Sequence, residues 1–191
     1  MRVIGGVYRA RLIDMPKGVD IRPTQDKVRE AIFNILGNIS GKAVLDLFSG
    51  SGAFGIESLS RGASKATFVE NNIRCVQTIE KNLEGLQIPA DRYDVIKRSA
   101  LRAIYDIEGD GLKYDIVFMD PPYHKDLAKN CLINLDSCDI LSQFATVVVE
   151  HYKLDELDFD LETLVTDKNR EYGDTVITFL KRHIENEDSQ P

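Results

Sequence analysis

Residues 44–55 read VLDLFSGSGAFG, an apolar segment that runs into a loop with glycine at positions 50, 52 and 55. A short, continuous apolar run is typical of a strand buried in a parallel sheet. Glycine lets the backbone approach a ligand closely, and the N-terminus of a following helix presents unpaired N–H groups. The stretch therefore predicts a strand, a ligand-binding loop and a helix.

The same order of strand and helix continues through the chain. After a first strand at 43–48, the apolar patterns predict strands at residues 66–70, 93–97, 114–119 and 145–150, and helices at 53–61, 72–86, 101–107 and 127–135. Such alternation predicts a mostly parallel sheet with helices on both faces. Two last strands, 161–166 and 175–180, are separated by a turn, so an antiparallel hairpin should complete a seven-stranded sheet.

The residues before this alternation predict a smaller attachment. Residues 1–14 alternate in a way that suits a short β-hairpin, and residues 25–36 have the spacing of a helix, with Thr24 as its N-cap. Residues 1–30 carry seven basic side chains against four acidic ones, although the net charge of the protein is −7. This basic segment could bind phosphate groups while the acidic remainder of the protein repels them. Alternatively, the uneven distribution of charge could have no function.

Other features exclude whole classes of protein. No apolar run approaches the roughly 20 residues that cross a bilayer. The N-terminus lacks the pattern of a signal peptide, so we expect a cytoplasmic protein. Cys75, Cys131 and Cys138 match no disulfide framework or zinc spacing, so we expect buried thiols and no metal site.

Two acidic residues help to identify the ligand of the glycine loop. The spacing G-x-G-x-x-G is shared with dinucleotide enzymes, which makes NAD one candidate. Asp46, near the end of the first strand, favours S-adenosylmethionine, because a carboxylate attracts a sulfonium and an ammonium but repels a pyrophosphate. Glu70 closes the second strand, where it could accept the ribose hydroxyls of either ligand or merely cap the next helix.

The predicted cofactor site includes neighbours of these residues. The whole set is Asp46, Phe48, Gly50, Ser51, Gly52, Glu70, Asn71, Ser99 and Ala100. Ser99 follows the third strand, a position that commonly faces adenine in this architecture. Its hydroxyl could equally bond the adenine amine or cap the helix that begins there.

Residues 120–123, DPPY, follow the fourth strand, at the edge where open α/β sheets bind ligands. Consecutive prolines keep the loop rigid. The Asp120 carboxylate and the Pro121 carbonyl could accept both hydrogens of an exocyclic base amine and aim its lone pair at a methyl donor. Tyr123 would stack on the base. The predicted catalytic residues are Asp120, Pro121, Pro122 and Tyr123, with a simple strand-terminating turn as the alternative.

Several motifs resemble one known family. Residues 46–52 and 120–123 are similar to the cofactor and catalytic motifs of class I amino-methyltransferases. Residues 1–9, 21–36, 148–151 and 172–175 resemble the RsmD family, and the likeness extends from residue 1 to about residue 182. The resemblance implies a Rossmann-like class I S-adenosylmethionine-dependent methyltransferase that methylates N2 of a guanine in 16S rRNA. The acidic net charge of −7 suggests that the RNA is presented within an assembled or partly assembled small ribosomal subunit.

The resemblance also implies roles for named residues. Asp120 and Pro121 would hold the guanine amine, and Tyr123 would stack on the ring. Many relatives have an acidic residue at the position of Ser99, which leaves the adenine contact open. The residues expected to contact RNA are Arg2, Tyr8, Arg9, Arg11, Arg22, Pro23 and Thr24.

The expected organisation is an RNA-contacting N-terminal hairpin and loop at 1–24, a methyltransferase domain at 25–183 and a disordered tail at 184–191. Two other functions stay open. A DNA adenine-N6 methyltransferase would use the same chemistry, although the chain has little room for a sequence-reading domain. A nucleotide-binding protein without methyltransferase activity would use the glycine loop but would leave residues 120–123 unexplained.

Overall fold

The computed structural model describes residues 1–19, 24–122, 127–155, 157 and 159–183. Their centre is a seven-stranded sheet with the order β3-β2-β1-β4-β5-β7-β6. The strands are β1 (Ala43–Leu47), β2 (Lys65–Glu70), β3 (Tyr93–Lys97), β4 (Tyr114–Met119), β5 (Leu141–Tyr152), β6 (Leu164–Tyr172) and β7 (Thr175–Arg182). The five strands β1 to β5 pair in parallel, and β7 is antiparallel to both β5 and β6. The predicted mostly parallel sheet with a terminal antiparallel hairpin is confirmed.

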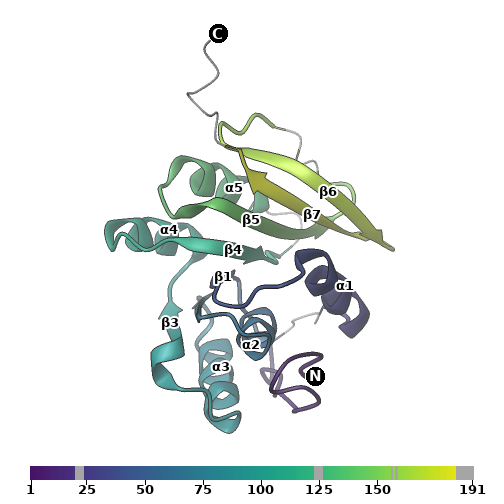
Figure 1. Cartoon of the computed structure of the whole chain (residues 1–191), viewed down its shortest axis with the longest axis vertical. Coiled ribbons are helices and arrows are strands. Elements are labelled where there is room, and N and C mark those ends of the chain that lie inside the picture. Colours follow the sequence, from purple (N-terminus) through teal and green to yellow (C-terminus); the bar gives the residue numbers. More distant parts are fainter. Residues whose placement is uncertain (20–23, 123–126, 156, 158, 184–191) are drawn as a thin grey trace.

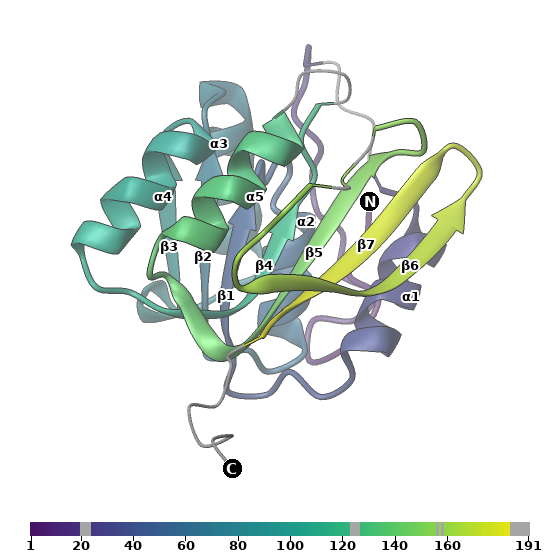
Figure 2. The same cartoon turned by 90° about the horizontal axis from the view of Figure 1, so that it is seen from above.

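Helices cover the two faces of this sheet (Figures 1 and 2). The helices are α1 (Asp26–Leu36), α2 (Ala53–Ser60), α3 (Ile73–Gly85), α4 (Ala100–Gly109) and α5 (Leu127–Ser137), with a short 3-10 turn at Ala90–Arg92. One hydrophobic cluster joins α1, α2 and α3 to one face, and a second joins α4 and α5 to the other. The result is a three-layer sandwich. None of the helices in the described part of the chain is long and apolar enough to cross a membrane.

The strand predicted at 161–166 is shifted along the chain as well as longer. β6 begins at Leu164, three residues later than predicted, and continues to Tyr172, although residues 167–171 are all polar or charged. β6 is an edge strand, and all its residues except the first and last are exposed. Exposed charges are compatible with an edge strand and discourage pairing with other chains, so hydrophobicity did not mark its end.

The N-terminal segment folds back on itself as a short hairpin. Backbone hydrogen bonds, such as that from the Val3 N–H to the Arg11 carbonyl at 3.0 Å, and one bridge between Arg2 and Leu12 join its two arms. Beyond these arms, the Ile4 and Gly5 N–H groups donate to the Glu57 carboxylate on α2, at 2.7 and 2.8 Å. Val3 and Ile13 belong to the same hydrophobic cluster as α1, α2 and α3. The segment is therefore attached to the body by its backbone and its apolar side chains.

The start of α1 differs from the prediction by one residue. Gln25 occupies the N-cap position and makes no side-chain cap bond. Thr24 is not the cap, and its hydroxyl instead lies within hydrogen-bond distance of two carboxylates, one just after β4 and one near the end of β5. The tertiary contact therefore replaces the local one.

Candidate active site

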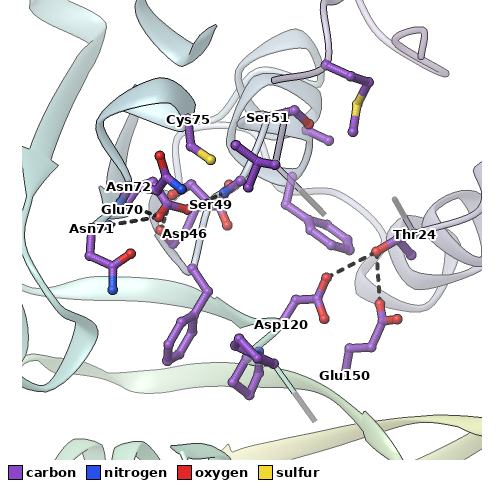
Figure 3. Close-up of a pocket in the computed structure, with 18 of the residues that line it drawn as sticks. Thr24, Asp46, Ser49, Ser51, Glu70, Asn71, Asn72, Cys75, Asp120 and Glu150 are labelled. Carbon is purple, nitrogen blue, oxygen red and sulfur yellow. Dashed lines mark hydrogen bonds between the residues drawn. The ribbon is translucent and has the colours of Figure 1, made fainter. Parts of the chain in front are cut away.

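A pocket of about 670 Å³ lies at the edge of the sheet where β1, β2, β4 and β5 end (Figure 3). The order of strands reverses around β1, which is where open α/β sheets bind ligands. Ten of the residues predicted from sequence line the pocket: Thr24, Asp46, Phe48, Gly50, Ser51, Glu70, Asn71, Asp120, Pro121 and Pro122. The fold thus brings the glycine loop and the DPP segment to one cavity. Tyr123, Arg22, Pro23 and the tail lie outside the described residues.

The glycine loop has a backbone that depends on glycine at two positions for different reasons. Gly52 has a φ of +79°, in the left-handed region, where it begins α2. A Cβ on Gly55 would lie 2.2 Å from the Phe68 ring, so glycine is required there for α2 to pack on β2. Gly55 therefore serves helix–sheet packing rather than ligand contact.

Asp46 is buried at the base of the loop. Its Oδ2 accepts the Gly55 N–H at 2.9 Å. Burial raises the pKa of Asp46 to about 7, the nearby Glu70 charge adds to the rise, and the Gly55 hydrogen bond opposes it. The site therefore gains from a cationic ligand, since a positive charge would favour the ionised form.

Glu70 ties the loop to the next helix. Its Oε2 accepts the Gly50 N–H at 2.9 Å, and its Oε1 accepts the N–H groups of Asn71 and Asn72, each at 2.8 Å. The Asn72 side chain in turn caps α3. Glu70 therefore orders the cofactor-facing backbone, and a contact with ribose hydroxyls stays a prediction.

The predicted adenine-side residues lie apart from this pocket. Ser99 is exposed at the N-cap of α4 without a side-chain cap bond. It lines a second hollow of about 570 Å³ with Lys97, Arg98 and Arg102, and Asn71 borders both hollows. Ala100 is buried in the core of α4, and Gly52 does not line the main pocket.

Where β4 and β5 reach the pocket, two carboxylates lie close to one hydroxyl group. Thr24 Oγ1 lies 2.9 Å from Glu150 Oε2 and 3.5 Å from Asp120 Oδ2 (Figure 3). Burial raises the pKa of Asp120 well above its usual value, and the charges of Glu150 and Asp46 raise it further. Asp120 therefore keeps its proton more readily than an ordinary carboxyl group.

Sequence reasoning gave Glu150 no role. The register of β4 and β5 pairs Met119 with Val149, so the next residues of both strands, Asp120 and Glu150, meet at the same edge. The signal was an acidic residue near the end of a predicted parallel strand. To interpret that signal one must know that β5 lies beside β4, and this order of strands comes only from the tertiary structure.

Asn82 on α3 is a second residue without a predicted role. Its Nδ2 donates to the Ser51 carbonyl and to the Asp14 carbonyl, each at 3.0 Å. Its Oδ1 accepts the Asp14 N–H at 2.7 Å. A single buried amide thus connects the glycine loop to the N-terminal segment.

Of the described residues predicted to contact RNA, Thr24 lines the pocket, whereas the arginines and the tyrosine of the N-terminal segment do not. Arg2 pairs with Asp26 at 3.4 Å, and the Arg11 guanidinium donates to the Gly85 carbonyl at 3.0 Å. The Tyr8 N–H donates to the Ser60 hydroxyl, and Tyr8 and Arg9 do not line the pocket. Arg29, counted above among the basic residues, is buried against Met1 and is not available to phosphate.

The three cysteines are free and buried, as expected. Among the described residues, no group of three or more histidine, cysteine, aspartate or glutamate side chains could hold a metal ion.

Comparison with known proteins agrees with this architecture. Residues 1–181 match the model of a family described as Conserved hypothetical protein 95. Ribosomal RNA small subunit methyltransferase D of Escherichia coli (strain K12) is 36% identical over 151 residues, which are 78% of this chain and 74% of that protein.

Solved structures extend the likeness to the fold. The Escherichia coli protein yhhF is 32% identical, with a TM-score of 0.85 over 96% of this chain and 98% of its own. SMU.776, solved in complex with SAH, shares the fold at 19% identity, with a TM-score of 0.68 over 84% of this chain and 50% of its own. The fold is the Rossmann-like fold of class I methyltransferases, as predicted. The chain belongs to the Conserved hypothetical protein 95 family, that is, the RsmD family.

Proposed function

We propose that this protein transfers a methyl group from S-adenosylmethionine to the exocyclic N2 amine of a guanine in small-subunit ribosomal RNA. The observation that carries the proposal is the pocket in which the DPP segment faces the glycine loop and Asp46. The 36% identical relative named as a small-subunit rRNA methyltransferase supports the choice of substrate.

The residues of the pocket fit S-adenosylmethionine. The volume of the pocket, about 670 Å³, is within the usual range for a cofactor site. Asp46 would face the cationic end of the cofactor, because its burial makes a nearby positive charge favourable. Gly50 and Glu70 would hold the nucleoside part. When bound, S-adenosylmethionine supplies an electrophilic methyl group.

The acceptor residues would activate the amine by orienting it. The lone pair of a base amine is delocalised into the ring, which makes the nitrogen a weak nucleophile. The Asp120 carboxylate and the Pro121 carbonyl would accept the two amine hydrogens and so favour a pyramidal nitrogen. Transfer would form the N–C bond as the methyl–sulfur bond of the bound sulfonium breaks and a neutral thioether leaves. The extra proton on the nitrogen would then pass to water, so no general base is required.

RNA would approach across the N-terminal segment. Met1, Met15 and Val19 line the pocket, so the described N-terminal residues 1–19 stand beside the place where the target base would enter. We assign Arg2, Tyr8, Arg9, Arg11 and residues 22–24 to RNA contact, and the rest of the chain up to residue 183 to methyl transfer. A flipped or unpaired base costs less to present in a loop than in a duplex.

The decisive experiment offers labelled S-adenosylmethionine with two substrates: small ribosomal subunits from cells that lack the enzyme, and unmodified duplex DNA. We expect label in N2-methylguanosine of the subunit RNA. Label in N6-methyladenine of the DNA would replace the proposal with the DNA-modifying alternative. Label in neither substrate, together with binding of NAD, would favour a nucleotide-binding protein.

The net charge of −7 suggests that ribosomal proteins help to present the RNA. We therefore place the reaction on an assembled or partly assembled subunit in the cytoplasm. Subunits should be methylated faster than the same RNA free of protein. Equal rates on both substrates would contradict this part of the proposal.

A further inference from the structure

Glu150 is the feature of the pocket that the proposed chemistry does not use. It lies near the end of β5, next to Asp120 at the end of β4, and it lines the same cavity. Thr24 Oγ1 donates to Glu150 Oε2 at 2.9 Å, while Asp120 is farther from that hydroxyl, at 3.5 Å. A hydroxyl has one hydrogen, so the shorter contact indicates that Thr24 orients Glu150.

Methylating an amine needs acceptors for two hydrogens, and the Asp120 carboxylate and the Pro121 carbonyl suffice for that. A second carboxylate so close to the first raises the pKa of Asp120 and is electrostatically unfavourable. A hydrogen-bond donor on the substrate would offset this repulsion. The pair therefore indicates a substrate edge with donors on two adjacent positions.

The Watson–Crick edge of guanine has that pattern. It presents the N2 amine and, beside it, the N1–H, and both are donors. Adenine presents an amine beside N1, which has a lone pair and is an acceptor. A carboxylate is an acceptor only, so it would attract the guanine edge and repel the adenine edge. Extruded bases are commonly read through this edge.

We propose that Glu150 selects guanine by accepting the N1–H of the target base, while Asp120 and the Pro121 carbonyl hold its N2 amine. The inference rests on the proposed function, since it names the residue that would make the same pocket specific for guanine. A carboxylate can accept several hydrogen bonds, so the bond from Thr24 and a bond from N1–H are compatible. Thr24 acts as a positioning residue for Glu150.

The test compares two substrate bases in wild-type protein and in the Glu150→Gln variant. 2-Aminopurine retains the 2-amine but has a lone pair at N1 and no O6. The guanine that the wild-type protein methylates is replaced with 2-aminopurine by RNA ligation, and both RNAs are assembled into small subunits. kcat/KM is measured for each. The ratio of the two values cancels effects that act equally on both substrates.

We expect the wild-type protein to prefer guanine by at least about 10²-fold, because a site built to bond a substrate N–H rejects an analogue that lacks it. The side-chain amide introduced by Glu150→Gln can donate to N1, so the preference should fall by at least about tenfold. Glu150→Ala removes the acceptor without adding a donor and should also lower the ratio. Glu171→Gln, the same change on the exposed edge strand, should leave the ratio unchanged.

The affinity of each variant for S-adenosylmethionine, measured by calorimetry, verifies that the pocket is folded. Equal losses on guanine and 2-aminopurine in both Glu150 variants, with the ratio unchanged, would show a structural role only and overturn the inference while the proposed function stands. A wild-type protein that labels no guanine would contradict the proposed function itself. The two failures are therefore distinguishable.

Discussion

The Asp46 carboxylate at the end of β1 accepts the backbone N–H of Gly55 in the first turn of α2, at 2.9 Å. This hydrogen bond links β1 directly to α2, the two elements that flank the glycine loop. It satisfies one oxygen of a carboxylate that is 2% exposed, yet it does not prevent the pKa from rising to about 7. Ligand affinity and protein stability should both depend on this one proton.

Affinity for S-adenosylmethionine should decrease as the pH falls below about 7, because the protonated form of Asp46 no longer attracts a cation. The decrease should approach tenfold per pH unit. Asp46→Asn should bind more weakly at pH 8 and lose this dependence. The ratio of wild-type to variant affinity, measured by calorimetry from pH 5.5 to 8, cancels the titration of the ligand. A constant ratio would mean that Asp46 does not face the cationic end.

The same proton should affect the stability of the ligand-free protein. A carboxyl group whose folded pKa is raised stabilises the fold most at low pH, and this contribution is lost as pH rises to the folded pKa. For Asp46 the loss should be on the order of 4 kcal/mol between pH 4 and 7, with no further change above 7. Asp46→Asn should lack it. Urea denaturation of both proteins at several pH values provides the comparison.

Asp120→Ala should lower the methyl-transfer rate by at least about 10²-fold, by analogy with removing other positioned polar catalytic groups. Cofactor affinity should be nearly unchanged. Asp120→Asn keeps an acceptor oxygen but cannot titrate. The raised pKa of Asp120 predicts that the wild-type rate increases with pH, since only the ionised form accepts freely. Single-turnover rates from pH 5.5 to 8.5 should show this increase in the wild-type protein and not in Asp120→Asn.

Near-normal turnover of Asp120→Ala would refute activation of the amine by this carboxylate. A pH profile that Asp120→Asn shares with the wild-type protein would assign the titration to another group.

Gly55→Ala should destabilise the protein by about 1–3 kcal/mol, the typical cost of overpacking a core. The new methyl group would meet the Phe68 ring at 2.2 Å, and that ring is fully buried in the core between α2 and β2. Gly85→Ala is the matched control. It lies at the end of α3 with open space around its Cβ, so alanine should be neutral or stabilising. Equal denaturation midpoints for the two variants would contradict the packing argument.

Glu57→Gln should loosen the N-terminal segment. Glu57 is 1% exposed, accepts two N–H groups from that segment and pairs with Arg61 at 2.7 Å. An amide cannot accept all three, so we expect a loss of about 2–4 kcal/mol. Hydrogen exchange at Ile4 and Gly5 should accelerate. Glu84→Gln, at an exposed position on α3, is the control, and slow exchange at Ile4 in Glu57→Gln would argue against this anchor.

The N-terminal segment also shows where sequence reasoning stops. Alternation over residues 1–14 predicted a short hairpin, which the backbone bonds between its arms agree with. It did not predict that the Ile4 and Gly5 N–H groups bond to Glu57, which is more than 50 positions away in the chain. Thr24 shows the same limit, since a local cap and a distant carboxylate compete for one hydroxyl. Short sequence patterns predict hydrogen bonds between nearby residues, but they do not identify partners that are distant in the chain.

The sequence by itself determined the order of elements, the glycine loop and the DPP segment, because apolar periodicity and backbone-restricting residues act over a few positions. It also predicted that Asp46 and Asp120 would reach one edge, since the carboxyl ends of parallel strands coincide. Only the tertiary structure decided that β5 lies beside β4 in the register that brings Glu150 to Asp120. It also decided that Asp46 is buried enough to shift its pKa, because register and desolvation depend on contacts between segments far apart in the chain.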